Sequence, residues 1–277
     1  MITDKESEYI KTHAYLPEHV IGYVAAVSGG EPYLFKDYLC YRKNDTLIFV
    51  GYPFKKSFDE KNMKKVLDAA VREFKPGRIA LIEPKILLKD ICHLERNTDE
   101  YYRLDLNNYT ISQKVRNMIS RAQRELLIDQ KNDCSDEHKN LISEFLNSHK
   151  VSEETKFIFG KIPEYISSSE TAFILNARDK HDRLVAFDVV EFGSIDYAFY
   201  MFNVTSRQNY VSGASDLLFY ELINTAKEKR FINLGLGINE GVRFFKRKWG
   251  GVPFLPYNFL LYEVNQKIAL ETLFQKL

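Results

Sequence analysis

The stretch LVAFDVVEFGSIDYAFYMFNVTSRQNYVSGASDLLFYELINTAKEKRFINLGL, Leu184 to Leu236, contains the pattern that decides the fold. Two apolar runs separated by Gly193-Ser194 predict a pair of strands, and a polar loop then leads into a helical period with Leu218 and Leu222 on its inward face. The expected elements are strands at 184–192 and 195–203, a helix at 214–229 and a strand at 231–235. The segment therefore predicts a strand–strand–helix–strand unit.

The same order of elements is expected earlier in the chain, at residues 33–83. A hairpin turns at Lys43-Asn44-Asp45, an amphipathic helix follows, and Pro76-Gly77 ends that helix. The two copies share no residue-level identity, so the repeat is one of architecture, and two such units predict mixed α/β or α+β halves. We place these halves at residues 1–106 and 107–277, with two unrelated domains as the alternative.

Three further segments have a recognisable period. We expect a strand at 20–27 and helices at 112–129 and 137–149. The 112–129 helix is basic on its polar side, from Lys114 to Arg124. Such a run of cations indicates either a solvated helix face or a site for an anion.

The composition indicates a folded protein, because 45% of the residues are hydrophobic and 28% are charged. A formal net charge of +1 creates no global attraction to DNA or to an anionic membrane. The three cysteines are far apart, which argues against a disulfide framework, and no run approaches 18 apolar residues. We therefore expect a cytoplasmic protein with no membrane span and no DNA partner.

Several common chemistries lack their sequence signatures. The six histidines show no metal-ligand spacing, and the chain has no serine-hydrolase elbow, Walker loop or dinucleotide fingerprint. We expect no metal.

The first candidate site is the loop that enters the helix at Ala214. Backbone N–H groups at Gly213, Ala214 and Ser215 lie at the positive end of the expected helix dipole, where a phosphate fits. Arg207 is positioned in sequence to add a charge-assisted contact. The alternative is that a serine of this loop simply caps the helix.

The second candidate site is the string GLGINEGVRFFKRKWGG, Gly235 to Gly251. Its glycines indicate a tight backbone path, and a short helix is expected at 239–248, with four cations within six residues. A solvated cationic face with aromatic residues in the core is the alternative interpretation.

Three segments together resemble the Fem-type, tandem-GNAT acyltransferases, a family that includes the soluble domain of phosphatidylglycerol lysyltransferases. KVRNMISRA at Lys114–Ala122 is similar to that family's K-x-R-N-x-I-x-[RK]-A helix. GASDLLFYE at Gly213–Glu221 is similar to its G-A-S-x-L-L-x-[WY]-E helix start, and FKRKWGG at Phe245–Gly251 to its F-K-x-[KR]-[FW]-G-G segment. Order and spacing agree across about residues 105–262, whereas the first 100 residues match only in expected architecture.

The resemblance implies an α/β (α+β) fold of two GNAT-like halves, each a mixed, mostly antiparallel sheet flanked by helices. It also implies transfer of an acyl group from acyl-CoA or aminoacyl-tRNA to an amine. The donor pyrophosphate would lie at Gly213, Ala214 and Ser215, while Phe245 and Lys246 match the motif whose lysine lies near the transferred group. A cation there would stabilise the oxyanion of a tetrahedral intermediate.

Two departures from the pattern bear on the donor. The usual GNAT signature [RQ]-x-x-G-x-[GA] is absent between Arg207 and Gly213, which puts acetyl-CoA itself in doubt. The long coiled-coil insertion by which some Fem enzymes contact tRNA is also absent.

An amine nucleophile must lose a proton, so a general base is expected on the central strands. The candidates are Asp188, Glu191, and Tyr200 acting through water. We favour Asp188, because a carboxyl group in an apolar strand is costly to bury unless it is paired or functional. A buried, hydrogen-bonded aspartate without a catalytic role is the alternative.

Three hypotheses for the function follow. The first is acyl transfer from acyl-CoA to an amine, and the second is aminoacyl transfer from tRNA to a lipid or peptide. The third is a catalytically degenerate GNAT pair that only binds ligands.

Overall fold

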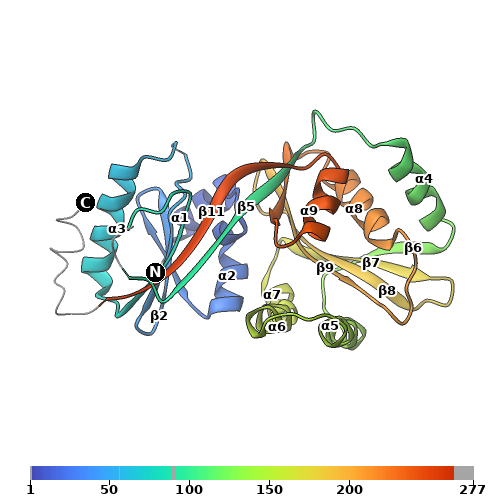
Figure 1. Ribbon diagram of the computed structural model, residues 1–277, viewed down its shortest axis with the longest axis horizontal. Coiled ribbons are helices and arrows are strands. Elements are labelled where there is room, and N and C mark those ends of the chain that lie inside the picture. Colours follow the sequence, from blue (N-terminus) through green and yellow to red (C-terminus); the bar gives the residue numbers. More distant parts are fainter. Residues whose placement is uncertain (1, 56, 89–91, 265–277) are drawn as a thin grey trace. The chain divides into compact units, whose positions relative to one another are not determined.

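The computed structural model describes residues 2–55, 57–88 and 92–264, and the chain forms two compact units (Figure 1). The first unit contains the described residues up to Tyr101, together with Leu236–Ile238 and residues 253–264. The second unit contains Tyr102–Gly235 and Asn239–Val252. The chain is therefore a mixed α/β protein in which a late segment returns to the unit built first.

The first unit places helices on both faces of a mixed sheet with the strand order β1-β2-β3-β4-β11. Its elements are α1 (Asp4–His13), a 3-10 turn η1 (Pro17–His19), α2 (Ile21–Ser28), β1 (Glu31–Phe35), β2 (Tyr38–Lys43), β3 (Thr46–Val50), α3 (Glu60–Phe74), β4 (Arg78–Glu83) and β11 (Val252–Glu263). β1 to β3 are antiparallel, β3 and β4 are parallel, and β11 is antiparallel to β4. Helix α3 packs on one face, and α1 and α2 pack on the other.

The second unit is built on the same principle, with the strand order β10-β9-β8-β7-β6. Its elements are the end of β5 (Glu95–Asp105), α4 (Gln113–Ala122), β6 (Leu126–Lys131), α5 (Asp136–Ser148), α6 (Glu153–Gly160), α7 (Ile162–Ser168), β7 (Ala172–Asp179), β8 (Leu184–Glu191), β9 (Tyr197–Thr205), α8 (Ala214–Thr225), β10 (Phe231–Leu236) and α9 (Glu240–Lys248). Strands β6 to β9 are antiparallel, and β9 is parallel to β10. Helices α4 and α8 cover one face, and α5 to α7 lie on the other (Figure 1).

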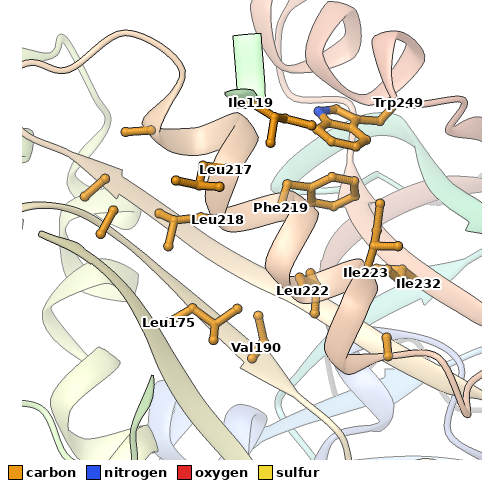
Figure 2. Close-up of a cluster of buried hydrophobic side chains, with 14 of the residues drawn as sticks. Ile119, Leu175, Val190, Leu217, Leu218, Phe219, Leu222, Ile223, Ile232 and Trp249 are labelled. Carbon is orange, nitrogen blue, oxygen red and sulfur yellow. The ribbon is translucent and has the colours of Figure 1, made fainter. Parts of the chain in front are cut away.

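Helix α8 is at the centre of the second core (Figure 2). Leu217, Leu218 and Phe219 are each at most 1% exposed and pack towards the sheet and Trp249. At about 1.5–3 kcal/mol for each large apolar side chain removed from water, this burial makes α8 a rigid element. Its first turn is therefore held in a fixed position.

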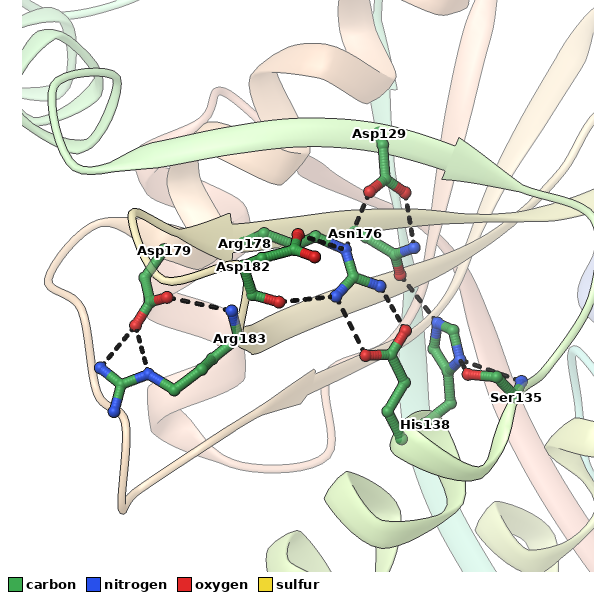
Figure 3. A network of polar contacts seen from close by, with 9 residues as sticks. Asp129, Ser135, His138, Asn176, Arg178, Asp179, Asp182 and Arg183 are labelled. Atoms are coloured by element: carbon green, nitrogen blue, oxygen red, sulfur yellow. Dashed lines mark hydrogen bonds and ion pairs between the residues drawn. The ribbon is translucent and has the colours of Figure 1, made fainter.

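A polar network fastens α5 to the edge of the same sheet (Figure 3). The His138 ring contacts the side-chain oxygen of Asn176 at 2.8 Å, and the Asn176 amide donates to Asp129 at 2.7 Å. Arg178 bridges Asp129 and Glu137, so strands β6 and β7 and helix α5 are cross-linked by charged groups. Within the described part of the chain this network carries structure rather than a reactive group.

The predicted repeat is present as β2-β3-α3-β4 and β8-β9-α8-β10. Two sequence predictions are wrong. Residues 20–27 form helix α2 rather than a strand, because a short apolar run does not distinguish the two. The helix predicted at 112–129 ends at Ala122, and Leu126–Lys131 forms strand β6 paired with β7.

Other elements have no counterpart in the sequence predictions. These are α1, η1, β5, α6, α7 and β11. The predicted halves also differ from the two units: the first unit ends at Tyr101 rather than at residue 106. Residues 253–263 belong to the first unit because β11 is hydrogen-bonded to β4, and residues 265–277 of the predicted second half lie outside the described residues.

Among the described residues, no helix has both the length and the apolar character needed to cross a bilayer.

Candidate functional site

The first turn of α8 is left open by its own sequence. Gly213 is the N-cap residue with φ +84°, a left-handed conformation that favours glycine, and it provides no side-chain cap. A Cβ atom there would lie 3.0 Å from Met118 Cγ and 3.3 Å from Ala122 Cβ, so the neighbouring helix α4 also excludes a side chain. In the described structure the Ser215 and Asp216 amides have no hydrogen-bond acceptor, and these N–H groups can bind an anion.

The loop before α8 has its first amides already occupied. The Glu144 carboxylate on α5 accepts hydrogen bonds from the Arg207 N–H at 2.7 Å and the Gln208 N–H at 3.0 Å, and from the Ser206 hydroxyl at 2.9 Å. Burial acts to raise the pKa of Glu144, but these hydrogen bonds outweigh it and hold the pKa below its usual value. The Arg207 residue is exposed, so its guanidinium is available while its backbone is not.

Helix α9 is joined to the first turn of α8 by Asp216. This carboxyl group is 5% exposed and accepts a hydrogen bond from Trp249 Nε1 at 2.9 Å. The same oxygen, Oδ1, pairs with Lys248 Nζ at 2.5 Å. The two motifs GASDLL and FKRKWGG therefore form one structural site, with Lys248 neutralising the acidic residue beside the open amides.

Lys246 is buried, with 3% of its surface exposed. Its Nζ lies 5.6 Å from the centroid of the Tyr102 ring. It would be 3.9 Å from a Cβ atom built on Gly235, which places the ammonium group beside the last residues of β10. A buried cation with an aromatic neighbour is poorly screened, so it acts strongly on any charge that develops nearby.

Asp188 is connected to the start of α8 through two hydrogen bonds. The Asn203 amide donates to Asp188 Oδ1 at 2.6 Å, and the Ser215 hydroxyl donates to Asn203 Oδ1 at 3.2 Å. Asp188 is fully buried, and its carboxyl group also interacts with the Tyr200 hydroxyl. Burial raises the pKa of Asp188 well above its usual value, and the hydrogen bonds with Asn203 and Tyr200 offset this in part.

Tyr200 lies among aromatic side chains on the same side of the sheet. Its ring is 5.2 Å from Phe219 and 6.2 Å from Phe245, centroid to centroid. Burial, followed by the charges of Asp188 and Asp216, raises the pKa of Tyr200 well above 10. The phenol therefore stays protonated near neutral pH and can donate a proton or a hydrogen bond.

Glu191, the remaining base candidate, is engaged elsewhere. It accepts hydrogen bonds from the Tyr165 hydroxyl at 2.7 Å and from the Gly193 N–H at 2.7 Å. Tyr165 belongs to α7, which lies on the opposite face of the sheet from α8. The Glu191 carboxylate therefore holds α7 against the sheet.

The strands beneath α8 are irregular at the site. Val189 pairs with Phe202 and Val190 with Tyr200, so Met201 is an extra residue that forms a bulge in β9. Strands β9 and β10 are paired only from Tyr197–Phe231 to Phe199–Asn233.

The structure thus brings most of the predicted residues to one face of the second unit. Asp188, Tyr200, Ser215 and Phe245 are linked by hydrogen bonds or ring contacts, directly or through one residue. Sequence reasoning missed Glu144, Asn203 and the Asp216–Lys248 pair. Asn203 offered one signal, because it is a polar residue at the end of an otherwise apolar strand.

In the described residues no group of three His, Cys, Asp or Glu side chains is placed to hold a metal ion.

Comparisons with known proteins identify the fold. No family model matches the sequence, and no curated protein matches it. Among solved structures, the chain is similar to L-PGS from Bacillus licheniformis, with 16% identity, 98% of this chain and 95% of the other covered, and a TM-score of 0.59. It is similar to the C-terminal domain of a putative lysylphosphatidylglycerol synthetase from Agrobacterium fabrum, with 15% identity, 99% and 97% covered, and a TM-score of 0.62.

The structure called FemX gives 10% identity, 99% of each chain covered and a TM-score of 0.61. A tandem GNAT protein from the clavulanic acid biosynthesis pathway gives 12% identity, 82% and 78% covered, and a TM-score of 0.52. The chain therefore has the tandem-GNAT fold of the Fem type, as the sequence resemblance predicts.

Proposed function

We propose that the chain is an acyltransferase that passes an acyl group from acyl-CoA to an amine. The observation that supports this most directly is the uncapped first turn of α8. Its open amides at Ser215 and Asp216 are backed by Lys248, and α9 also contributes the buried Lys246. A phosphate group of the acyl carrier would bind these amides, because N–H groups at a helix N-terminus favour a negative charge.

The proposed reaction needs three roles from the chain. The amine attacks the acyl carbonyl, forming the C–N bond, and Lys246 stabilises the oxyanion of the intermediate. Asp188, in its ionised form, accepts the proton that the amine loses. The C–S bond to the carrier then breaks, and Tyr200 acts as the proton donor to the leaving sulfur.

Arg207 and Phe245 would complete the donor site. The exposed Arg207 guanidinium can reach a phosphate from the loop before α8, and Phe245 forms part of the apolar wall beside Tyr200. The acceptor amine belongs to a small molecule, a lipid or a peptide. Because acyl-CoA is made and used in the cytoplasm, we propose that the reaction takes place there.

A second donor, aminoacyl-tRNA, is favoured by one feature of α4. Four cations of α4 and the turn that follows it are exposed and form no ion pair within the described part of the chain: Lys114, Arg116, Arg121 and Arg124. Met118 of the same helix lies beside Gly213, so α4 is a neighbour of the open first turn of α8. A polyanion such as the end of a tRNA would neutralise several of them.

Measuring the Tm of the protein with each donor distinguishes the acyl-CoA hypothesis from the aminoacyl-tRNA hypothesis. For a ligand that binds only the native state, stabilisation grows as RT ln(1 + [L]/Kd), so millimolar acyl-CoA should raise Tm by a few degrees. Aminoacyl-tRNA at low salt would instead bind with a steep salt dependence that Arg121→Ala and Arg124→Ala reduce. If neither donor shifts Tm and neither supports turnover, the chain is a ligand-binding GNAT pair without catalysis.

A further inference from the structure

One carboxylate of the second unit occupies backbone N–H groups that an outside anion would otherwise bind. Glu144 belongs to α5 and reaches the loop between β9 and α8. Its Oε1 atom accepts hydrogen bonds from the Arg207 N–H at 2.7 Å, the Gln208 N–H at 3.0 Å and the Ser206 hydroxyl at 2.9 Å. Successive N–H groups that converge in this way form an anion-binding concavity, and here the protein's own carboxylate fills it.

The start of this loop is fixed by further hydrogen bonds. The Ser206 N–H donates to the Val185 carbonyl oxygen at 2.8 Å, and the Asn209 N–H donates to the Ser206 hydroxyl oxygen at 2.9 Å. Ser206 is only 1% exposed, so water competes weakly for these contacts. The carboxylate of Glu144 is therefore held at a defined place beside the loop.

The Glu144 carboxylate carries its negative charge at neutral pH. Burial acts to raise its pKa, but the hydrogen bonds outweigh burial and keep the pKa below its usual value. The three groups that donate to Glu144 are two amides and a hydroxyl, which are neutral and do not cancel the charge. A phosphate that approached this part of the loop would therefore be repelled.

The loop thus has an occupied end beside Glu144 and an open end at the first turn of α8. At the open end the Ser215 and Asp216 amides have no acceptor in the described structure. The Ser215 hydroxyl is bonded to Asn203, and Ser206 lies three residues further along the chain, so the two ends are roughly 10 Å apart at about 3.3 Å per residue. A phosphate at the open end gains hydrogen bonds, whereas a further phosphate that extends along the loop meets a fixed negative charge.

We propose that Glu144 is a specificity-determining residue that limits recognition of the acyl donor to a single phosphate group. The donor class is then the thioesters of 4′-phosphopantetheine, of which acyl-CoA is one member. The adenosine and the remaining phosphates of CoA add little affinity. This inference rests on the acyl transfer proposed above, because it concerns the same donor site.

The first test is titration calorimetry of the whole chain with three probes that differ in their phosphates. Pantetheine has none, 4′-phosphopantetheine has one, and CoA has a diphosphate and a 3′-phosphate. We expect 4′-phosphopantetheine to bind about tenfold more tightly than pantetheine, because its phosphate gains charge-assisted hydrogen bonds from the open amides. The affinity for CoA should lie within about threefold of that for 4′-phosphopantetheine, because the loop amides are in use and the nearby charge is negative.

Two variants separate the charge of Glu144 from its hydrogen bonds. Glu144→Gln keeps an acceptor oxygen for the loop amides and removes the charge, whereas Glu144→Ala removes both. The readout is the ratio of the affinities for CoA and 4′-phosphopantetheine, because a general loosening of the loop weakens both probes. This ratio should rise about threefold in Glu144→Gln and about tenfold in Glu144→Ala, where two amides also become free.

The control is Glu228→Gln, which removes the same charge at an exposed position beyond the other end of α8 and should leave the ratio unchanged. An unchanged ratio in both Glu144 variants would overturn the inference and leave acyl transfer standing. So would a wild-type protein that binds CoA about tenfold or more tightly than 4′-phosphopantetheine, since the further phosphates would then be recognised. If none of the three probes binds and no thioester is turned over, the acyl-thioester donor is wrong and this inference fails with it.

Discussion

The chain contains one architectural module twice, and the two copies treat the start of their helix in opposite ways. The first module is β2-β3-α3-β4, residues 38–83, and the second is β8-β9-α8-β10, residues 184–236. Helix α3 begins at Asp59, whose carboxylate accepts a hydrogen bond from the Asn62 N–H at 2.6 Å. Helix α8 begins at Gly213, which has no side chain to offer.

The strand pairing is also more regular in the first module than in the second. In the first module β3 and β4 are paired over five residues, Thr46–Arg78 to Val50–Ile82. In the second module β9 and β10 are paired over three, and β9 contains a bulge at Met201. One topology thus yields a closed module, in which the protein's own carboxylate occupies the helix end, and an open module that can accept an outside anion.

The variant Lys246→Met should show the largest effect of this difference between the two modules. If the open module performs the transfer, loss of the buried cation should lower kcat by about 100-fold, the size found when one oxyanion-stabilising group is removed. The measurement is steady-state turnover with the donor that passes the binding test. Lys227→Met, at an exposed position near the other end of α8, should leave kcat unchanged. Full activity of Lys246→Met would remove this residue from the proposed mechanism.

The pH–rate profile sharpens the role of Asp188. Because burial raises its pKa, the base form is lost at a higher pH than for an ordinary aspartate, and below that raised pKa the rate should rise up to tenfold per pH unit. Asp188→Asn should be slow and should lose this rise. A flat wild-type profile, with Asp188→Asn active, would reduce Asp188 to a residue that positions Asn203.

A carboxylate added at the helix start should convert the open module towards the closed one. Ser212→Asp places a negative charge immediately before Gly213 and should raise the donor KM about fivefold, because two like charges at about 4 Å repel by about 1 kcal/mol in water. The effect should shrink in high salt. The comparable serine change in the first module, Ser57→Asp, two residues before the N-cap of α3, should leave KM unchanged. Equal KM values for Ser212→Asp and the wild type would show that the donor phosphate lies elsewhere.

The smallest expected effect is on stability alone. Asp59→Ala removes the cap of α3 and should lower the free energy of unfolding by about 1 kcal/mol without altering turnover. Chemical denaturation and steady-state assays measure the two quantities. A loss of activity at unchanged stability would mean that the first module has a catalytic role.

Regular amphipathic spacing explains which elements were predictable. Helices α8 and α9 lie within four residues of their predicted bounds, and α3 ends before Pro76 as predicted, since each combines apolar positions at helical spacing with a polar start. Residues 20–27 and 126–129 were assigned wrongly, because their apolar residues satisfy more than one period and only tertiary packing decides between them.

The residues of the candidate site also fall into two groups, those that a local sequence pattern indicates and those that depend on tertiary packing. Gly213–Ser215 could be located from local chemistry, since a glycine before a helix predicts exposed amides. The Glu144 contact with the 206–208 loop and the Asp216–Lys248 pair join residues more than thirty positions apart. Their partners depend on how α5 and α9 pack, which no local pattern contains.

The last strand of the fold has a consequence for biosynthesis. Strand β4 is complete once residue 83 has been made, yet its neighbour β11 ends at Glu263, and the two pair from Glu83–Asn258 to Arg78–Glu263. While the ribosome adds the intervening residues, the edge of β4 lacks its native partner, and an unpaired edge invites association with other nascent chains. Most of the first unit is therefore synthesised before the second unit, but its sheet is completed only after the second unit has been made.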